Sequence, residues 1–106
     1  MDLAEFDELV MGLPDVRRRS ERGLWRWQYH GRLVARQVHG TAVVVRVPFD
    51  VRDLLVRQSP EVFSVPARFA KHMMVLAELS ADDDGAVEEA VNSAWRLQSA
   101  HLPGSH

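Results

Sequence analysis

Apolar side chains recur along the chain at two different periods, which mark where helices and strands should form. In residues 2–12 they recur every three or four positions, which is typical of one apolar stripe on a helix. Gly12 and Pro14 should end that helix. In residues 24–29 three aromatic side chains alternate with polar ones, and this period of two predicts a β-strand.

Two His-Gly pairs follow, and each should form a short turn between antiparallel strands. The strands after these turns are expected at residues 32–38 and 42–47, which gives a three-stranded meander. Residues 15–23 come before the meander and are rich in arginine without any alternation. We expect this stretch to be a polar linker.

The second half of the chain should hold two more helices and two more strands. Asp50 is suited to cap the first of these helices, because a carboxylate accepts hydrogen bonds from free N–H groups at a helix start. Three consecutive aspartates, residues 82–84, should begin the last helix. The other expected ranges are a helix at 51–58, strands at 62–65 and 73–79, and a loop or single turn at 67–72.

The resulting order, α-β-β-β-α-β-β-α, predicts an α+β fold in which a mostly antiparallel sheet has helices packed on one side. A chain of 106 residues is the common size for one domain, expected at residues 1–101 with a frayed tail at 102–106. The predicted core consists of Phe6, Leu9, Val10, Val43, Val45, Leu54, Leu55, Phe63, Leu76, Val91 and Trp95.

Charge is unevenly distributed along the chain, although the net charge is only −2. Residues 1–15 contain five acids and no base, whereas residues 16–57 contain ten arginines against three acids. Residues 58–106 are acidic again, with seven acids and three bases. Such segregation predicts a bipolar molecule. The isoelectric point near 6.2 is well below the value above about 9 that is usual for strong nucleic-acid binders.

The arginines have two interpretations. They could bind phosphates, with Trp25, Trp27 and Tyr29 stacking on unpaired bases. They could instead be the solvated face of a sheet whose aromatic side chains form the core, and the alternation with Arg26 favours the core for the aromatics. The first interpretation predicts a nucleic-acid-binding face that consists of Arg17, Arg18, Arg19, Arg22, Arg26, Arg32 and Arg36.

Other chemistry finds little support in the sequence. The absence of cysteine excludes disulfides, thiolate nucleophiles and cysteine-based metal sites. His30 and His39 fall at predicted turns and His72 in a loop, without a ligand spacing, so we expect no metal site and no cofactor. Acids on the first helix are explained by its dipole. No nucleophile elbow or phosphate-binding glycine loop is present, and we expect no enzyme activity.

The N-terminus is acidic and lacks the basic start and apolar core of a signal peptide. The longest apolar run, residues 42–45, is far shorter than the roughly 20 residues that span a membrane. We expect a cytoplasmic protein that does not enter membranes.

Four short sequence motifs occur in a specific order and spacing, namely LPDV at 13–16, GRLVA at 31–35, SPEVF at 59–63 and AWRL at 94–97. Together they resemble the MmcQ/YjbR family of small bacterial proteins over roughly residues 3–98. One departure is AKHMM at 70–74, where relatives often have glycine, proline and tryptophan before the last strand.

The resemblance implies a CyaY-like (frataxin-like) fold, also described as a double wing, and a DNA-binding role. It implies no catalytic residues. We therefore predict a non-catalytic DNA-binding module. The alternative is a protein-interaction or self-associating module, in which the basic middle of the chain meets an acidic protein or another copy in a homodimer.

Overall fold

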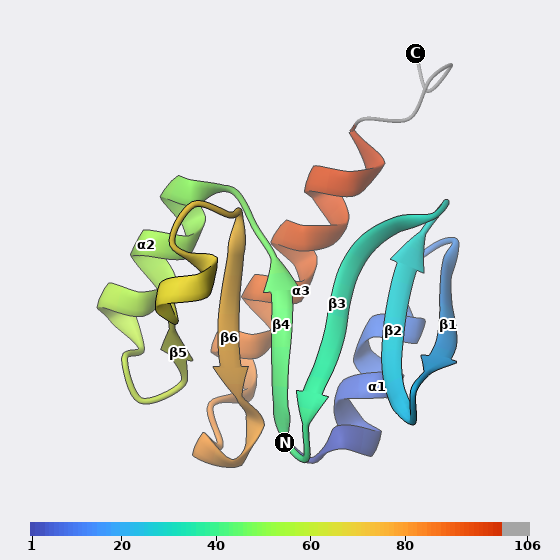
Figure 1. Cartoon of the computed structure of the whole chain (residues 1–106), viewed down its shortest axis with the longest axis horizontal. Coiled ribbons are helices and arrows are strands. Elements are labelled where there is room, and N and C mark those ends of the chain that lie inside the picture. The colour runs from blue at the N-terminus through green and yellow to red at the C-terminus, as the bar shows by residue number, and fades with distance from the viewer. Residues whose placement is uncertain (101–106) are drawn as a thin grey trace.

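The computed structural model describes residues 1–100, so the predicted tail lies outside the described residues (Figure 1). The helices are α1 (Leu3–Met11), α2 (Phe49–Gln58) and α3 (Asp84–Ser99), with short 3-10 helices η1 (Ala67–Phe69) and η2 (Leu79–Ala81). The strands are β1 (Val16–Glu21), β2 (Leu24–Tyr29), β3 (Arg32–His39), β4 (Ala42–Arg46), β5 (Phe63–Ser64) and β6 (Met74–Glu78).

The six strands form one antiparallel sheet in the order β1-β2-β3-β4-β6-β5. Strands β1 to β4 are a meander, and the chain then crosses through α2 to the other end of the sheet. All three helices lie on the same side, with α3 behind the central strands and α1 behind β1 and β2 (Figure 1). This arrangement confirms the predicted α+β class. We call the covered side the helix face and the other side the open face.

The first helix is fixed by a capping box. The Asp2 carboxylate accepts from Glu5 N at 2.8 Å, and the Glu5 carboxylate accepts from Asp2 N at 3.1 Å. At the last helix Asp83 accepts from Ala86 N at 3.2 Å, which confirms that the aspartates begin α3. Both caps use carboxylates to satisfy N–H groups that have no partner inside the helix.

The predicted cap at Asp50 is wrong. Helix α2 begins at Phe49, the preceding Pro48 holds the cap position without a side-chain hydrogen bond, and Asp50 lies in the first turn. The free N–H groups of the first turn therefore have no side-chain cap, and the Asp50 carboxylate complements the positive end of the helix dipole from within that turn.

The predicted linker at residues 15–23 is also wrong, because most of it is strand β1. This strand pairs with β2 over its full length. Arg22 and Gly23 form the connecting turn, with φ angles of 55° and 80°. Two left-handed residues between strands are typical of a type I′ turn, whose twist matches that of the sheet. The meander therefore has four strands, not three.

The core lies between the helix face and the helices. Most of the predicted members are buried there, including Phe6, Val10, Val45 and Phe63. Leu54 is an error, since its side chain is 37% exposed. Helix α2 covers only the β5–β6 end of the sheet, and of its residues only Leu55 is fully buried. Leu76 is half-buried and lies on the open face, while Leu9 and Trp95 pack half-buried against the core.

Candidate anion-binding face

The strand register places three arginines side by side. Arg19 of β1 lies opposite Arg26 of β2, and Arg26 lies opposite Arg36 of β3. Directly opposed residues on neighbouring strands share one face of a sheet, with Cα atoms about 4.5–5.5 Å apart. Arg19, Arg26 and Arg36, which we call the arginine row, thus run across three strands at right angles to them.

The neighbour of Arg26 shows which face the row occupies. Trp27 is completely buried, its ring meets the Phe6 ring edge-on at 5.1 Å, and its Nε1 donates to Asp7 Oδ1 at 2.8 Å. Phe6 and Asp7 belong to α1, so Trp27 lies on the helix face. Because successive side chains of a strand point to opposite faces, Arg26 and the whole row lie on the open face.

The row has little compensating negative charge. Arg19 comes within 3.6 Å of the Glu21 carboxylate, and both side chains are well exposed. Among residues 1–100, no carboxylate lies within 4.0 Å of Arg26 or Arg36, although both are half-buried. Like charges directly opposite one another destabilise a sheet. The row therefore has a cost in stability that a bound anion would remove.

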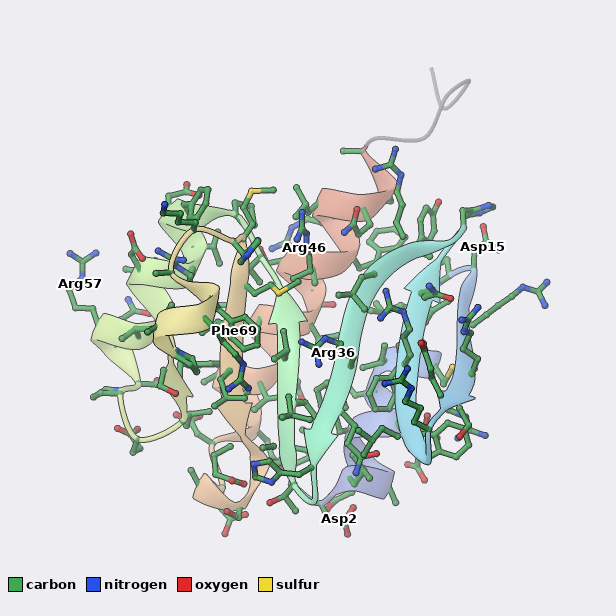
Figure 2. All side chains as sticks on the ribbon, viewed as in Figure 1. Asp2, Asp15, Arg36, Arg46, Arg57 and Phe69 are labelled. Carbon is green, nitrogen blue, oxygen red and sulfur yellow. The ribbon has the colours of Figure 1, made fainter. Side chains whose placement is uncertain are left out.

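The basic surface continues onto β4 and η1. Val44 of β4 is the partner of Arg36, and Arg46 lies two positions farther along the same strand. Arg46 therefore lies on the same face as the row, diagonally across from Arg36, and it is half-buried. Figure 2 shows Arg36 beside Phe69, with Arg46 farther along β4. The guanidinium carbon of Arg36 lies 5.7 Å from the centroid of the Phe69 ring, and that of Arg68 lies 4.6 Å from it. The predicted face omits Arg46, although its place after Val45 on an alternating strand indicates that it points away from the core.

Arg52 of α2 holds the η1 segment against the sheet. Its guanidinium Nη1 donates to the carbonyl oxygens of Phe69, Ala70 and His72 at 3.4, 3.1 and 2.9 Å. Its side chain is only 12% exposed. This arginine is thus part of the scaffold and does not belong to the anion-binding face.

A pocket of about 230 Å³ lies beside the row, at the β1–β2 turn. Gln37 shapes one wall, because its Oε1 accepts from Trp25 N at 3.1 Å and its Nε2 donates to Gly40 O at 3.0 Å. We call this space the hairpin pocket, and it is lined by Glu21, Arg22, Leu24, Trp25, Arg26, Arg36 and Gln37.

The structure brings five of the seven predicted arginines to this region. Arg17 lies opposite Gln28, on the same face as the row, and Arg22 lies in the turn that borders the pocket. The other three are the row itself.

Two predicted arginines lie on the helix face. Arg18 donates to Asp7 Oδ2 at 2.6 Å and stacks over the Trp25 ring at 4.1 Å. Arg32 lies opposite Tyr29, whose ring meets Trp95 of α3 edge-on at 6.0 Å. Neither side chain shares a face with the row, so they form no part of the candidate site.

The three aromatic residues of β2 belong to the helix face. Trp27 and Tyr29 are buried in the core, and Trp25 is half-buried against it beneath Arg18. This confirms that they are core residues. An anion on the open face would therefore meet guanidinium groups and none of the three aromatic rings of β2.

The two sides of the molecule differ in charge. Residues 16–46, which form the meander, contain eight arginines and one acid. The helices α1 and α3 with their caps, residues 2–11 and 82–99, contain nine acids and one base. Apart from Arg18 and Arg32, the meander arginines lie on the open face or in the turn beside it, so the charge segregation is largely also a segregation in space, with a basic open face and an acidic helix side.

Within the described part of the chain, no three His, Asp or Glu side chains gather as a metal site would require. His30 instead lies 3.5 Å from the Asp15 carboxylate. No helix among residues 1–100 has both the length and the apolar character needed to cross a bilayer. Comparisons of the chain with models of protein families, with curated proteins and with solved structures found no match.

Proposed function

We propose that this chain is a non-catalytic binding module whose open face binds the phosphate backbone of DNA. The arginine row carries the proposal, because it places three arginines in register across three strands, and among residues 1–100 Arg26 and Arg36 have no carboxylate partner. Guanidinium forks match the geometry of phosphate oxygens and form charge-assisted hydrogen bonds with them.

Contacts on this face should position DNA without reading its sequence. Base reading usually needs a helix or ribbon in the major groove with Arg, Asn or Gln side chains on base edges. All three helices lie on the other, acidic side of the sheet (Figure 1). The β2 aromatics that could stack on bases are held on the helix face. We therefore expect sequence-tolerant binding through phosphates.

The test is a fluorescence-anisotropy titration with duplex and single-stranded DNA at several salt concentrations. Contacts to about four phosphates predict that log affinity falls against log salt with a slope of about −3 to −4. Replacing the row by Arg19→Gln, Arg26→Gln and Arg36→Gln should weaken binding and make that slope shallower by roughly 2–3.

The matched control removes the same charge elsewhere. Arg32→Gln, Arg57→Gln and Arg96→Gln change exposed arginines outside the open face. This control should keep most of the affinity and the slope of the parent protein. An equal loss in both variants would show that only net charge matters, and a parent that binds no DNA at low salt would overturn the proposal.

The charge of the helix side favours one alternative, a self-associating module. The acidic α1 and α3 side of one copy could meet the basic open face of another, with a contact that need not close into a symmetric dimer. Sedimentation at low and high salt would reveal such association, and competition by DNA would decide which partner the open face prefers. The MmcQ/YjbR resemblance and the cytoplasmic location stay predictions beside this proposal.

A further inference from the structure

Arg22 adopts a backbone conformation that is unusual for its residue type. Four non-glycine residues among those described have positive φ angles, namely Asp15, Arg22, His30 and Asp82. Aspartate and histidine are enriched in this left-handed region, whereas long side chains such as arginine are not. Asn-Gly is the preferred pair for a type I′ turn, and here arginine takes the place of asparagine. Strain of this kind is often kept where a side chain has a function.

Arg22 lies at a place where its side chain can contact a bound ligand. It borders the hairpin pocket together with Arg26 and Arg36, so arginines from the turn, β2 and β3 line one space. The guanidinium of Arg36 is directed toward Phe69, 5.7 Å from that ring, while its side chain still borders the pocket. Among the described residues Glu21 is the only acid in the lining, so the lining carries three positive charges against one negative.

We propose that the hairpin pocket binds a phosphomonoester, and that this group is the terminal phosphate of a nucleotide chain lying on the open face. The inference rests on the proposed function and adds a preference for phosphorylated ends. A phosphomonoester carries about −1.5 to −2 charges at neutral pH, whereas each phosphodiester in a chain carries one. The charge of the pocket therefore matches an end better than an internal phosphate.

The size of the pocket supports the same ligand. At about 230 Å³ it is smaller than the roughly 300–1,000 Å³ of sites that enclose drug-sized molecules. It can accept a phosphate group while the attached sugar and base stay outside. The remainder of the chain would then continue along the arginine row.

The pH dependence should come from the ligand. The charged groups that line the pocket are Glu21, Arg22, Arg26 and Arg36, and no histidine is among them. The second pKa of a phosphomonoester is about 6. The advantage of a phosphorylated end should therefore shrink as pH falls from about 7.5 to about 5.5, because the ligand loses its second charge.

The experiment compares two single-stranded oligonucleotides that differ only in a 5′-phosphate, each labelled at its 3′ end. At pH 7.5 and low salt the phosphorylated one should bind about tenfold more tightly, the size of one additional charge-assisted contact. At pH 5.5 the ratio should fall to about threefold. A free nucleoside monophosphate, used as competitor, should bind at least tenfold more weakly than the phosphorylated oligonucleotide, because it cannot reach the row.

Two variants should shift the preference in opposite directions. Arg22→Asn removes a cation from the pocket but supplies the Asn-Gly pair that the turn favours, so the fold should be kept. It should abolish most of the preference, because it should weaken binding of the phosphorylated oligonucleotide several-fold more than binding of the unphosphorylated one. Glu21→Gln should increase the preference. The control is His30→Asn, which makes the equivalent change in the β2–β3 turn, where φ is 46°, and should leave the preference unaltered.

The outcomes separate the two proposals. Equal affinity for both oligonucleotides would overturn the end preference and leave DNA binding by the open face intact. A nucleoside monophosphate as tight as the phosphorylated oligonucleotide would overturn the assignment to a chain end. A preference that survives Arg22→Asn would exclude the hairpin pocket as its source, and a parent protein that binds neither oligonucleotide would overturn both proposals.

Discussion

Arg26 should be more favourable for binding than for folding, and a single substitution can show this. It stands between Arg19 and Arg36 in the register of the sheet, so it meets a like charge on both sides. Arg26→Gln removes its charge and keeps part of its aliphatic stem. We expect this variant to be more stable than the parent protein and weaker in DNA binding.

The gain in stability can be estimated from the energies of cross-strand pairs. Directly opposed pairs change stability by roughly 0.2–1 kcal/mol each, and like charges in such pairs are destabilising. Taking about 0.8 kcal/mol for each of the two pairs gives about 1.6 kcal/mol, from which roughly 0.5 kcal/mol is lost with the packing of the longer side chain. The expected gain is about 1 kcal/mol, which corresponds to a rise of about 4–8 °C in Tm for a domain of this size.

Urea unfolding, followed by tryptophan fluorescence, provides the assay. At about 20 mM salt the full gain should appear, and at about 0.5 M it should nearly vanish, because the Debye length falls from about 20 Å to about 4 Å. Arg57→Gln at the end of α2 is the control and should show no comparable gain. A loss of stability in Arg26→Gln at low salt, or a gain that does not depend on salt, would refute the repulsion on which this reasoning depends.

Three further predictions concern the scaffold. Trp27→Phe should destabilise the protein by about 2–3 kcal/mol in denaturant unfolding, because it leaves a cavity in the core and breaks the hydrogen bond to Asp7; an unchanged midpoint would contradict the buried position. The hydrogen bond from Thr41 lowers the pKa of Glu78, and hydrogen bonds from the backbone and side chain of Ser80 lower it further. The stabilising contribution of the Glu78 carboxylate is therefore present above about pH 4.5 and is lost as pH falls through the lowered pKa. Glu78→Gln should therefore flatten the acid side of a Tm-against-pH curve, and an identical curve would refute this. Arg52→Met should cost about 1–2 kcal/mol, because the carbonyls of Phe69, Ala70 and His72 lose a charged donor, although those of Phe69 and His72 keep a backbone N–H partner. It should also increase amide exchange in the η1 segment.

The fold was largely predictable from the sequence because most elements carry a clear apolar period. The exception is β1, whose sequence has one buried position at Val16 followed by charged and polar residues. An edge strand with little apolar side-chain contact shows no alternation, and backbone pairing holds it in place. The Arg-Gly pair before β2 could have indicated the turn, but arginine is not a residue that a left-handed position usually carries.

The candidate site was predictable in composition but not in arrangement. The sequence shows that arginines are concentrated before and within the meander. Which of them are neighbours depends on the register, and the β2–β3 register shifts between Trp27 and Gln28. Such a shift moves every later side chain relative to its partner strand, and sequence alone does not reveal it. Contacts such as that of Arg18 with Asp7 come from the packing of α1, which no local pattern encodes.

The position of β1 has a consequence for how copies of this protein behave when crowded. Its outer side is a free sheet edge, the kind of surface along which chains join into larger sheets. Of the three successive arginines at residues 17–19, Arg18 is paired with Asp7 at 2.6 Å, while Arg17 and Arg19 keep that edge positive, so that two copies approaching edge to edge should repel one another. A bound polyanion would neutralise the same charges and remove the repulsion between the edges of two copies. Light scattering should therefore increase near the ratio of DNA to protein at which charges balance, and fall again when DNA is in excess.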